Sequence, residues 1–343
     1  MIRLSTFLRA AALSCVATGL WACSNPGERA VPGAQGAPST RAARVAGKIT
    51  EYALPTANGS PFDIAAGPDG ALWFTECSGG KIGRITTSGS LTEFGLPHGG
   101  APEGIALGPD GAMWFADNVR GAIGRITTSG KIVEHPLPTS SAQPFGITAG
   151  PDGALWFTEC GANKLGKITT GGAIGEFPIP GRSLQPIYIT AGPDGRIWFT
   201  EYAGQQIGRT PTNATPGSGS TIKHFPVRAK SSPNGIAAGP DGAMWFALGL
   251  HIGRIAADAK PGSAKIKLYP GPAGALDITL GPDNAMWFTD YANNGIGRIT
   301  TTGKLTEYPI PTKNAGPRGI VAGPDGAIWF TECAGNRIGR LQP

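Results

Sequence analysis

One unit occurs seven times along this chain. The segment Gly-Pro-Asp-Gly-Ala-Leu-Trp-Phe-Thr-Glu at 67–76 recurs with small changes, at steps of 41, 42, 42, 47, 42 and 42 residues. The copies begin at Gly67, Gly108, Gly150, Gly192, Gly239, Gly281 and Gly323. A repeat of this length is typical of architectures in which neighbouring units bury one another's apolar surfaces.

Each unit reads as four short strands, here called a to d from first to last. Strand a is short and apolar, Gly-Pro-Asp-Gly forms a turn, Ala-Leu-Trp-Phe-Thr-Glu is strand b, and strands c and d follow around a Thr-Gly turn. Helical repeats need a 3.6-residue apolar period, which is absent, and the 54 Gly and 31 Pro residues also argue against helices. The sequence predicts an all-β, seven-bladed β-propeller of four-stranded blades over residues 47–343.

The last unit ends at Pro343, just after its strand c. Residues 47–54 (Gly-Lys-Ile-Thr-Glu-Tyr-Ala-Leu) read as a strand d without a blade of its own. Pairing this N-terminal strand with the last blade would close the ring and remove two open sheet edges.

The N-terminal region resembles an export signal followed by a tether. Residues 1–22 carry Arg3 and Arg9 before an apolar stretch too short to span a bilayer. Leu-Trp-Ala-Cys at 20–23 resembles a bacterial lipobox, which implies lipidation of Cys23 in the periplasm or cell envelope; an ordinary signal peptide cut nearby is the alternative. Residues 23–46, rich in Pro, Gly, Ala and Ser, are expected to be disordered.

The formal net charge of +6 does not indicate nucleic-acid binding. Much of the basic excess recurs singly in the repeat, and runs of Lys or Arg are absent. We expect a monomer that meets a membrane only through its lipid anchor and binds a small molecule or protein on one face. That face carries the b-to-c and d-to-a loops, because strands a begin and strands b end there.

Strand b ends in an acidic residue in six of the seven units. Symmetry predicts a ring of carboxylates that would favour a bound cation such as Mg²⁺ or Ca²⁺. The alternative is that each acid bonds loop backbone in its own blade and was copied with the repeat. These candidate metal ligands are Glu76, Asp117, Glu159, Glu201, Asp290 and Glu332.

Two other repeated features are expected to be structural. The basic residue of strand c should pair across strands or cover the blade surface, and the Trp-Phe pairs should pack between blades.

The cysteines that follow strand b are Cys77, Cys160 and Cys333. Because the first and last blades are neighbours, Cys77 and Cys333 could approach each other; small buried residues are the alternative.

The motifs Pro-x-Gly-Ile before Gly-Pro-Asp-Gly, Ile-Gly-Arg-Ile-Thr-Thr and Thr-Glu-Tyr-Pro-Ile-Pro resemble those of the virginiamycin B lyase (streptogramin B lyase) family across residues 47–343. The resemblance implies a Mg²⁺-assisted elimination that opens a cyclic depsipeptide. It also implies a proton-transferring histidine in the x place of two adjacent blades and a metal-linked Glu at the end of strand b.

None of the seven residues assigned to the x place is histidine. Near blades five and six, where the histidines are expected, the chain offers Asn234 and Ala275, with Leu248 and Asp290 ending strands b. Asn, Ala and Leu cannot transfer a proton at neutral pH. The seven residues read in the x place are Phe62, Glu103, Phe145, Ile187, Asn234, Ala275 and Arg318.

The four histidines do not replace the missing pair. His135 and His224 fall on outer strands, while His98 and His251 fall in loops three blades apart. Two functions stay open: a ligand-binding or scaffold propeller, and a metal-assisted lyase or lactonase acting on another cyclic ester with a carboxylate base. The candidate base is Glu103.

Overall fold

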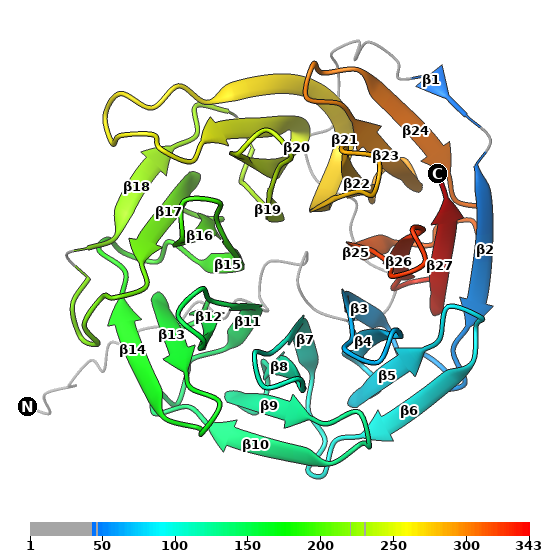
Figure 1. The fold of residues 1–343 in the computed structure, drawn as a ribbon, viewed down its shortest axis with the longest axis horizontal. Coiled ribbons are helices and arrows are strands. Elements are labelled where there is room, and N and C mark those ends of the chain that lie inside the picture. Colours follow the sequence, from blue (N-terminus) through cyan, green and yellow to red (C-terminus); the bar gives the residue numbers. More distant parts are fainter. Residues whose placement is uncertain (1–42, 46, 220, 230) are drawn as a thin grey trace, which may run out of the picture.

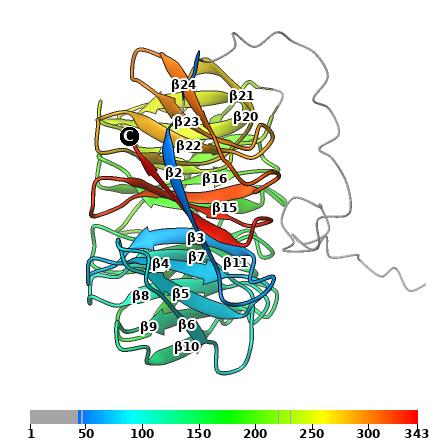
Figure 2. The same cartoon turned by 90° about the vertical axis from the view of Figure 1, so that its right-hand side faces the viewer.

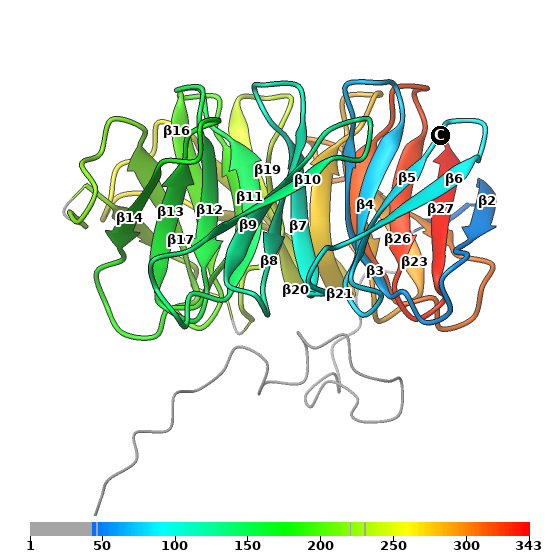
Figure 3. The same ribbon diagram turned by 90° about the horizontal axis from the view of Figure 1, so that it is seen from below.

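The computed structural model describes residues 43–45, 47–219, 221–229 and 231–343, which form a ring of blades (Figure 1). The expected export signal, nearly all of the expected tether, and Cys23 lie outside these residues. Figures 2 and 3 show the ring edge-on, with its loops gathered at two opposite faces. No helix long and apolar enough to cross a membrane is found in the part of the chain that the structure describes.

Strands a and b form the inner half of each blade. The innermost strands are β3 (Pro61–Ala66), β7 (Pro102–Leu107), β11 (Pro144–Ala149), β15 (Pro186–Ala191), β19 (Ile236–Ala238), the end of β21 (Lys267–Leu280) and β25 (Pro317–Ala322). The second strands are β4 (Leu72–Glu76), β8 (Met113–Asp117), β12 (Leu155–Glu159), β16 (Arg196–Glu201), the start of β20 (Ala243–Ala256), β22 (Met286–Asp290) and β26 (Ile328–Glu332).

Strands c and d form the outer half. The third strands are β5 (Lys81–Ile85), β9 (Ala122–Ile126), β13 (Lys164–Ile168), β17 (Gln206–Pro211), the end of β20, β23 (Gly295–Ile299) and β27 (Arg337–Gln342). The outer strands are β6 (Leu91–Gly95), β10 (Ile132–Pro136), β14 (Ile174–Pro178), β18 (Lys223–Pro226), the start of β21, β24 (Leu305–Pro309) and β2 (Lys48–Ala53).

Blade seven takes its outer strand from the other end of the chain, as predicted. β2 pairs antiparallel with β27, from Lys48 opposite Gln342 to Ala53 opposite Arg337. Blade seven also contacts blade one, because the Thr331 hydroxyl donates a 2.8 Å hydrogen bond to the Phe62 carbonyl. One feature was not predicted: β1 (Ala43–Arg44), inside the expected tether, adds a parallel strand to the outer edge of β24.

The repeated turn, tryptophan and basic residue form one bonded unit. In blade two, Asp110 of the turn accepts hydrogen bonds from Trp114 Nε1 at 2.9 Å and from Arg125 Nε at 2.6 Å. Gly111 of the same turn has φ of +73°, a conformation that glycine adopts without strain. The expectation that the strand c basic residue is structural is confirmed by this pairing.

Packing between blades also follows the prediction. All seven tryptophans of the repeat are fully buried, and each packs against the phenylalanine of the next blade, as Trp114 packs against Phe157. A glycine of strand c makes room for its own blade's phenylalanine: a Cβ on Gly83 would lie 2.1 Å from the Phe74 ring. The ring is therefore held by a chain of equivalent apolar contacts rather than by one central core.

Candidate functional site

Strands a begin and strands b end on the same face, here called the loop face. Pro61, the first residue of β3, lies opposite Glu76, the last residue of β4, and the same pairing recurs between Pro102 and Asp117. The predicted placement of the b-to-c and d-to-a loops on one face follows from this register.

The strand b acids lie inside their own blades. In blade one, Glu76 is fully buried beside Glu93 of strand d. The Lys81 ammonium lies 2.8 Å from a Glu93 oxygen, and that carboxylate accepts hydrogen bonds from the backbone N–H and hydroxyl of Thr56. Thr56 belongs to the loop that enters from blade seven, so these residues fasten two blades together.

Blades three and seven repeat this arrangement. Glu159 lies near Glu176 and Lys164, and Glu332 lies near Glu51 and Arg337. Burial, together with the neighbouring glutamate, raises the pKa of Glu76 to about 7 and the pKa values of Glu159 and Glu332 to about 8. A carboxyl in this setting is favoured in its neutral form.

Three blades vary the pattern. Asp117 accepts hydrogen bonds from the backbone N–H groups of Ala101 and Arg120. Glu201 accepts a hydrogen bond from the Gln206 side-chain amide and lies within hydrogen-bond distance of His224 Nδ1. Asp290 binds Asn293, and its pKa is raised to about 6 by burial.

The residues near these acids suit a structural role better than a divalent cation. Lys81, Lys164 and Arg337 already supply positive charge beside the paired carboxyls. Among the described residues, no group of three or more His, Cys, Asp or Glu side chains is arranged to hold a metal ion. The Mg²⁺ or Ca²⁺ site remains a prediction.

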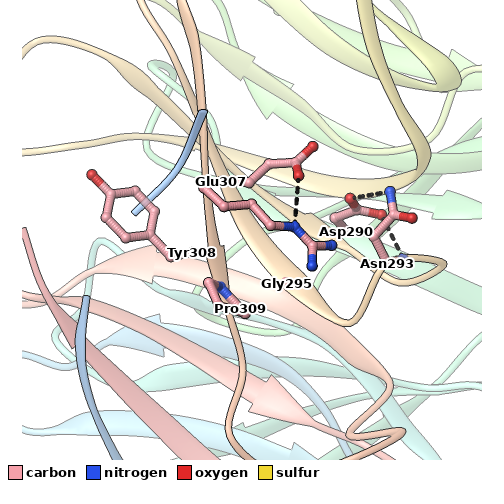
Figure 4. Close-up of a pocket in the computed structure, with 7 residues that line it drawn as sticks. Asp290, Asn293, Gly295, Glu307, Tyr308 and Pro309 are labelled. Carbon is pink, nitrogen blue, oxygen red and sulfur yellow. Dashed lines mark hydrogen bonds and ion pairs between the residues drawn. The ribbon is translucent and has the colours of Figure 1, made fainter. Parts of the chain in front are cut away.

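A small pocket on the loop side of blade six contains Asp290 (Figure 4). Arg44 of β1 reaches into it and lies 3.7 Å from Glu307. Strand c of this blade starts with Gly295, so Arg44 supplies the positive charge that Lys81 supplies in blade one. This pocket lies at the outer strands, away from the axis.

The histidines do not form a catalytic pair. His135 stacks on Trp114, and burial lowers its pKa, whereas His224 lies 3.0 Å from a Glu201 oxygen. Both lie on outer strands, as predicted. His98 is exposed in its loop, but the loop placement expected for His251 was wrong, because His251 lies within β20, opposite Pro270 of β21.

The x place in blade six was assigned incorrectly. Ala275 lies opposite Asp290, which is the position that Pro61 holds opposite Glu76, so the x residue of this blade is Leu276. Blade six has lost both the proline and the glycine of Pro-x-Gly-Ile, and its strand a continues without a break from strand d of blade five. Leucine has no acid–base function, and the corrected assignment still leaves every x place without a histidine.

The x-place side chains converge near the axis. Phe62 of blade one meets Phe145 of blade three with ring centroids 5.6 Å apart, although blade two lies between them. The Arg318 guanidinium lies 5.0 Å from the centre of the Phe62 ring. In six blades the register of strand a shifts at this point, which redirects the side chains.

Three larger residues replace the motif glycine next to the x place. Asp63 accepts hydrogen bonds from the N–H groups of Ile64 and of Ile105 in the next blade, and Asp277 does the same with Ile278 and Ile320. The third is Tyr188, whose ring packs on Phe145 at 5.5 Å. We call these three residues and the seven x-place residues the axial cluster: Phe62, Asp63, Glu103, Phe145, Ile187, Tyr188, Asn234, Leu276, Asp277 and Arg318.

Charges in the axial cluster interact across the ring. Burial raises the pKa of Tyr188 well above its usual value, and the nearby Asp277 and Asp63 raise it further. Burial also raises the pKa of Glu103 well above its usual value, although Arg318 lowers it.

Asp63, Tyr188 and Asp277 were not among the residues predicted from the sequence. The sequence feature that could have indicated them is the loss of glycine in three copies of Pro-x-Gly-Ile.

The cysteines are not paired as Cys77 with Cys333, the bridge that the sequence left open. Cys77 and Cys160 are disulfide-bonded, while Cys333 is a free thiol. A bridge between Cys77 and Cys333 is therefore not formed.

Comparison with known proteins gives the family. The model of the virginiamycin B lyase family matches residues 39–255 and 220–343. The chain belongs to this family. A solved structure of a streptogramin B lyase is 34% identical with a TM-score of 0.78, and the match covers 86% of this chain and 97% of that one.

Two further relatives extend the comparison. A catalytically inactive histidine-to-alanine variant of virginiamycin B lyase from Staphylococcus aureus, solved with quinupristin, is 36% identical with a TM-score of 0.78 over 86% of this chain and 99% of that one. The virginiamycin B lyase of Bordetella parapertussis is 39% identical over 51 residues, 15% of this chain. The chain spans only 17% of the length of that curated relative.

Proposed function

We propose that this protein is an exported ligand-binding propeller that has the lyase scaffold without its histidine-based chemistry. One observation carries the proposal: no x place, with blade six corrected to Leu276, holds a histidine. The S. aureus relative solved as a histidine-to-alanine variant is described as catalytically inactive. A propeller of this family without such a histidine is expected to bind rather than to turn over the family's substrate.

The axial cluster is the proposed binding site. It joins buried aromatic rings, Phe62 and Phe145, to polar groups of five blades on the loop face. Ligand sites commonly combine an apolar lining with a few placed polar groups. Asn234 stands in one expected histidine place, and its amide can hydrogen-bond a ligand but cannot accept a proton at neutral pH.

Quinupristin turnover tests the proposal. The purified protein is incubated with quinupristin, with and without Mg²⁺, and the products are followed by liquid chromatography and mass spectrometry, with the S. aureus lyase as a positive control. We expect the cyclic compound to remain. A product of unchanged mass but altered retention would show elimination, and a gain of one water would show hydrolysis; either product would overturn the proposal.

Glu103 favours a second candidate, a carboxylate-based lyase or lactonase. It is buried, its pKa is raised, and its Oε2 atom has no hydrogen-bond partner, which are properties of general acids and bases. If any turnover is found, it should disappear in Glu103→Gln.

Export and anchoring belong to the same proposal. The apolar segment at 10–21 followed by Cys23 supports transfer to the cell envelope and lipidation. Incorporation of labelled palmitate by the full chain, and its loss in Cys23→Ser, would support the anchor; equal labelling of both would contradict it.

A further inference from the structure

We propose that the axial cluster selects a ligand in which a protonated amine is joined to an apolar group. The inference rests on the proposed binding function and names the ligand class of the same site. Three properties of the cluster carry it: unpaired acceptors, an excess of carboxyl groups, and an adjoining apolar surface.

Two buried oxygens in x places have no hydrogen-bond donor. They are Oε2 of Glu103 and Oδ1 of Asn234, whose residues are 5% and 6% exposed. A buried acceptor without a partner is destabilising. Neither atom is bonded to the other, and a ligand that donates hydrogen bonds would give both of them a partner.

Carboxyl groups outnumber cations in the axial cluster. Asp63, Glu103 and Asp277 are acidic, whereas Arg318 is its single basic member. Glu103 and Arg318 interact electrostatically, and so do Asp63 and Asp277. Burial raises the pKa values of these carboxyls, and a ligand ammonium would favour their ionised forms, whereas a ligand carboxylate would disfavour them.

The apolar part of the ligand would pack on the partly exposed Tyr188, because Phe62, Phe145 and Ile187 are themselves buried. Phe62, Phe145 and Ile187 form one contact cluster, against which Tyr188 packs. Tyr188 and Arg318 are partly exposed, so the cluster is not sealed from solvent. Glu103 comes from the blade between Phe62 and Phe145, which places the proposed ammonium partner beside the aromatic surface.

Three compounds of similar shape and different charge test the inference. 2-Phenylethylamine is the cationic probe, 3-phenylpropionate the anionic one and 2-phenylethanol the neutral one, each titrated into the full chain by isothermal calorimetry. We expect the amine to bind at least tenfold more tightly than either of the others. Equal affinities, or no binding of the amine, would overturn the inference.

Variants locate the binding. Glu103→Gln keeps the shape of the side chain and should weaken amine binding at least fivefold, bringing it close to that of the alcohol. Glu134→Gln is the matched control, because Glu134 is a partly buried glutamate on the outer strand of the same blade. It should leave the preference unchanged, and a preference that survives Glu103→Gln would contradict the assignment.

A second substitution and a competing ion complete the test. Asn234→Asp adds a carboxylate and should strengthen amine binding, so loss of binding in this folded variant would count against the inference. Displacement of the amine by millimolar Ca²⁺, with Ca²⁺ binding that depends on Glu103, would show a metal site instead. These outcomes are separate from quinupristin turnover, which alone decides the lyase question.

Discussion

At the residue scale, side-chain direction decides which repeated residues reach the axis. Strand side chains point out of the plane of a sheet, and the sheets of a propeller face one another around the ring. Glu76 and its equivalents therefore face strand d of their own blade and the adjoining loops, although their positions repeat with the symmetry of the ring. The x-place residues reach the axis because they lie on the innermost strand, where its register shifts.

Glu159→Gln should make the protein more stable at alkaline pH. The native pKa of Glu159 is raised to about 8 from the ordinary 4.5, so the native state holds a proton that the unfolded chain releases. Stability from this residue is complete below pH 4.5 and is lost as pH rises from 4.5 to 8. Glutamine mimics the protonated acid and has no such loss.

Urea unfolding at a series of pH values measures this effect. The variant should equal the wild type near pH 4 and exceed it by about 2 kcal/mol or more at pH 8.5. Asp258→Asn, at an exposed carboxyl, is the control and should show no such trend. A difference between Glu159→Gln and wild type that does not vary with pH would contradict the assigned protonation state.

At the scale of the strand and turn, the fold was predictable and the site was not. The Gly-Pro-Asp-Gly turn and the Trp-Phe strand predicted the blade, because local turn chemistry and apolar packing agree in all seven copies. The axial residues lie where the copies differ. Blade six lacks the proline and glycine of Pro-x-Gly-Ile, so its sequence does not mark Leu276 as the x residue. Only the pairing of β21 with β22 shows which residue occupies the x place.

Asp110→Ala should destabilise blade two by about 1–3 kcal/mol, because the buried Trp114 N–H loses its acceptor and Arg125 loses its partner. Asp110→Asn keeps an acceptor and should lose less. Burial raises the pKa of Asp110, but bonds from Trp114 and Arg125 outweigh it and hold the pKa below its usual value. The difference between wild type and alanine variant should therefore shrink as pH falls below about 4.

Chemical denaturation of the three proteins at pH 7 and pH 3 provides the measurement. Equal losses for the alanine and asparagine variants at pH 7 would show that charge, rather than the acceptor for Trp114, carries the effect.

At the scale of the whole molecule, the ring depends on its N-terminal strand. A chain beginning at residue 55 lacks β2, exposes the edge of β27 and removes the stacking of Tyr52 on Trp329. We expect its thermal midpoint to fall by on the order of 10 °C, or the protein to aggregate. A chain beginning at Gly47 keeps β2 and is the control; equal midpoints for both truncations would contradict the role of β2.

The pairing of β2 with β27 also determines how the molecule responds to force. Lys48, near the start of the ring, lies opposite Gln342, next to the final residue. Tension applied between the two ends of the chain would load this ladder at one end and open its hydrogen bonds one after another, as a zipper opens. Once β1 has separated from β24, the strand that seals the ring at rest is therefore the first part of the ring to open under a pull from both termini.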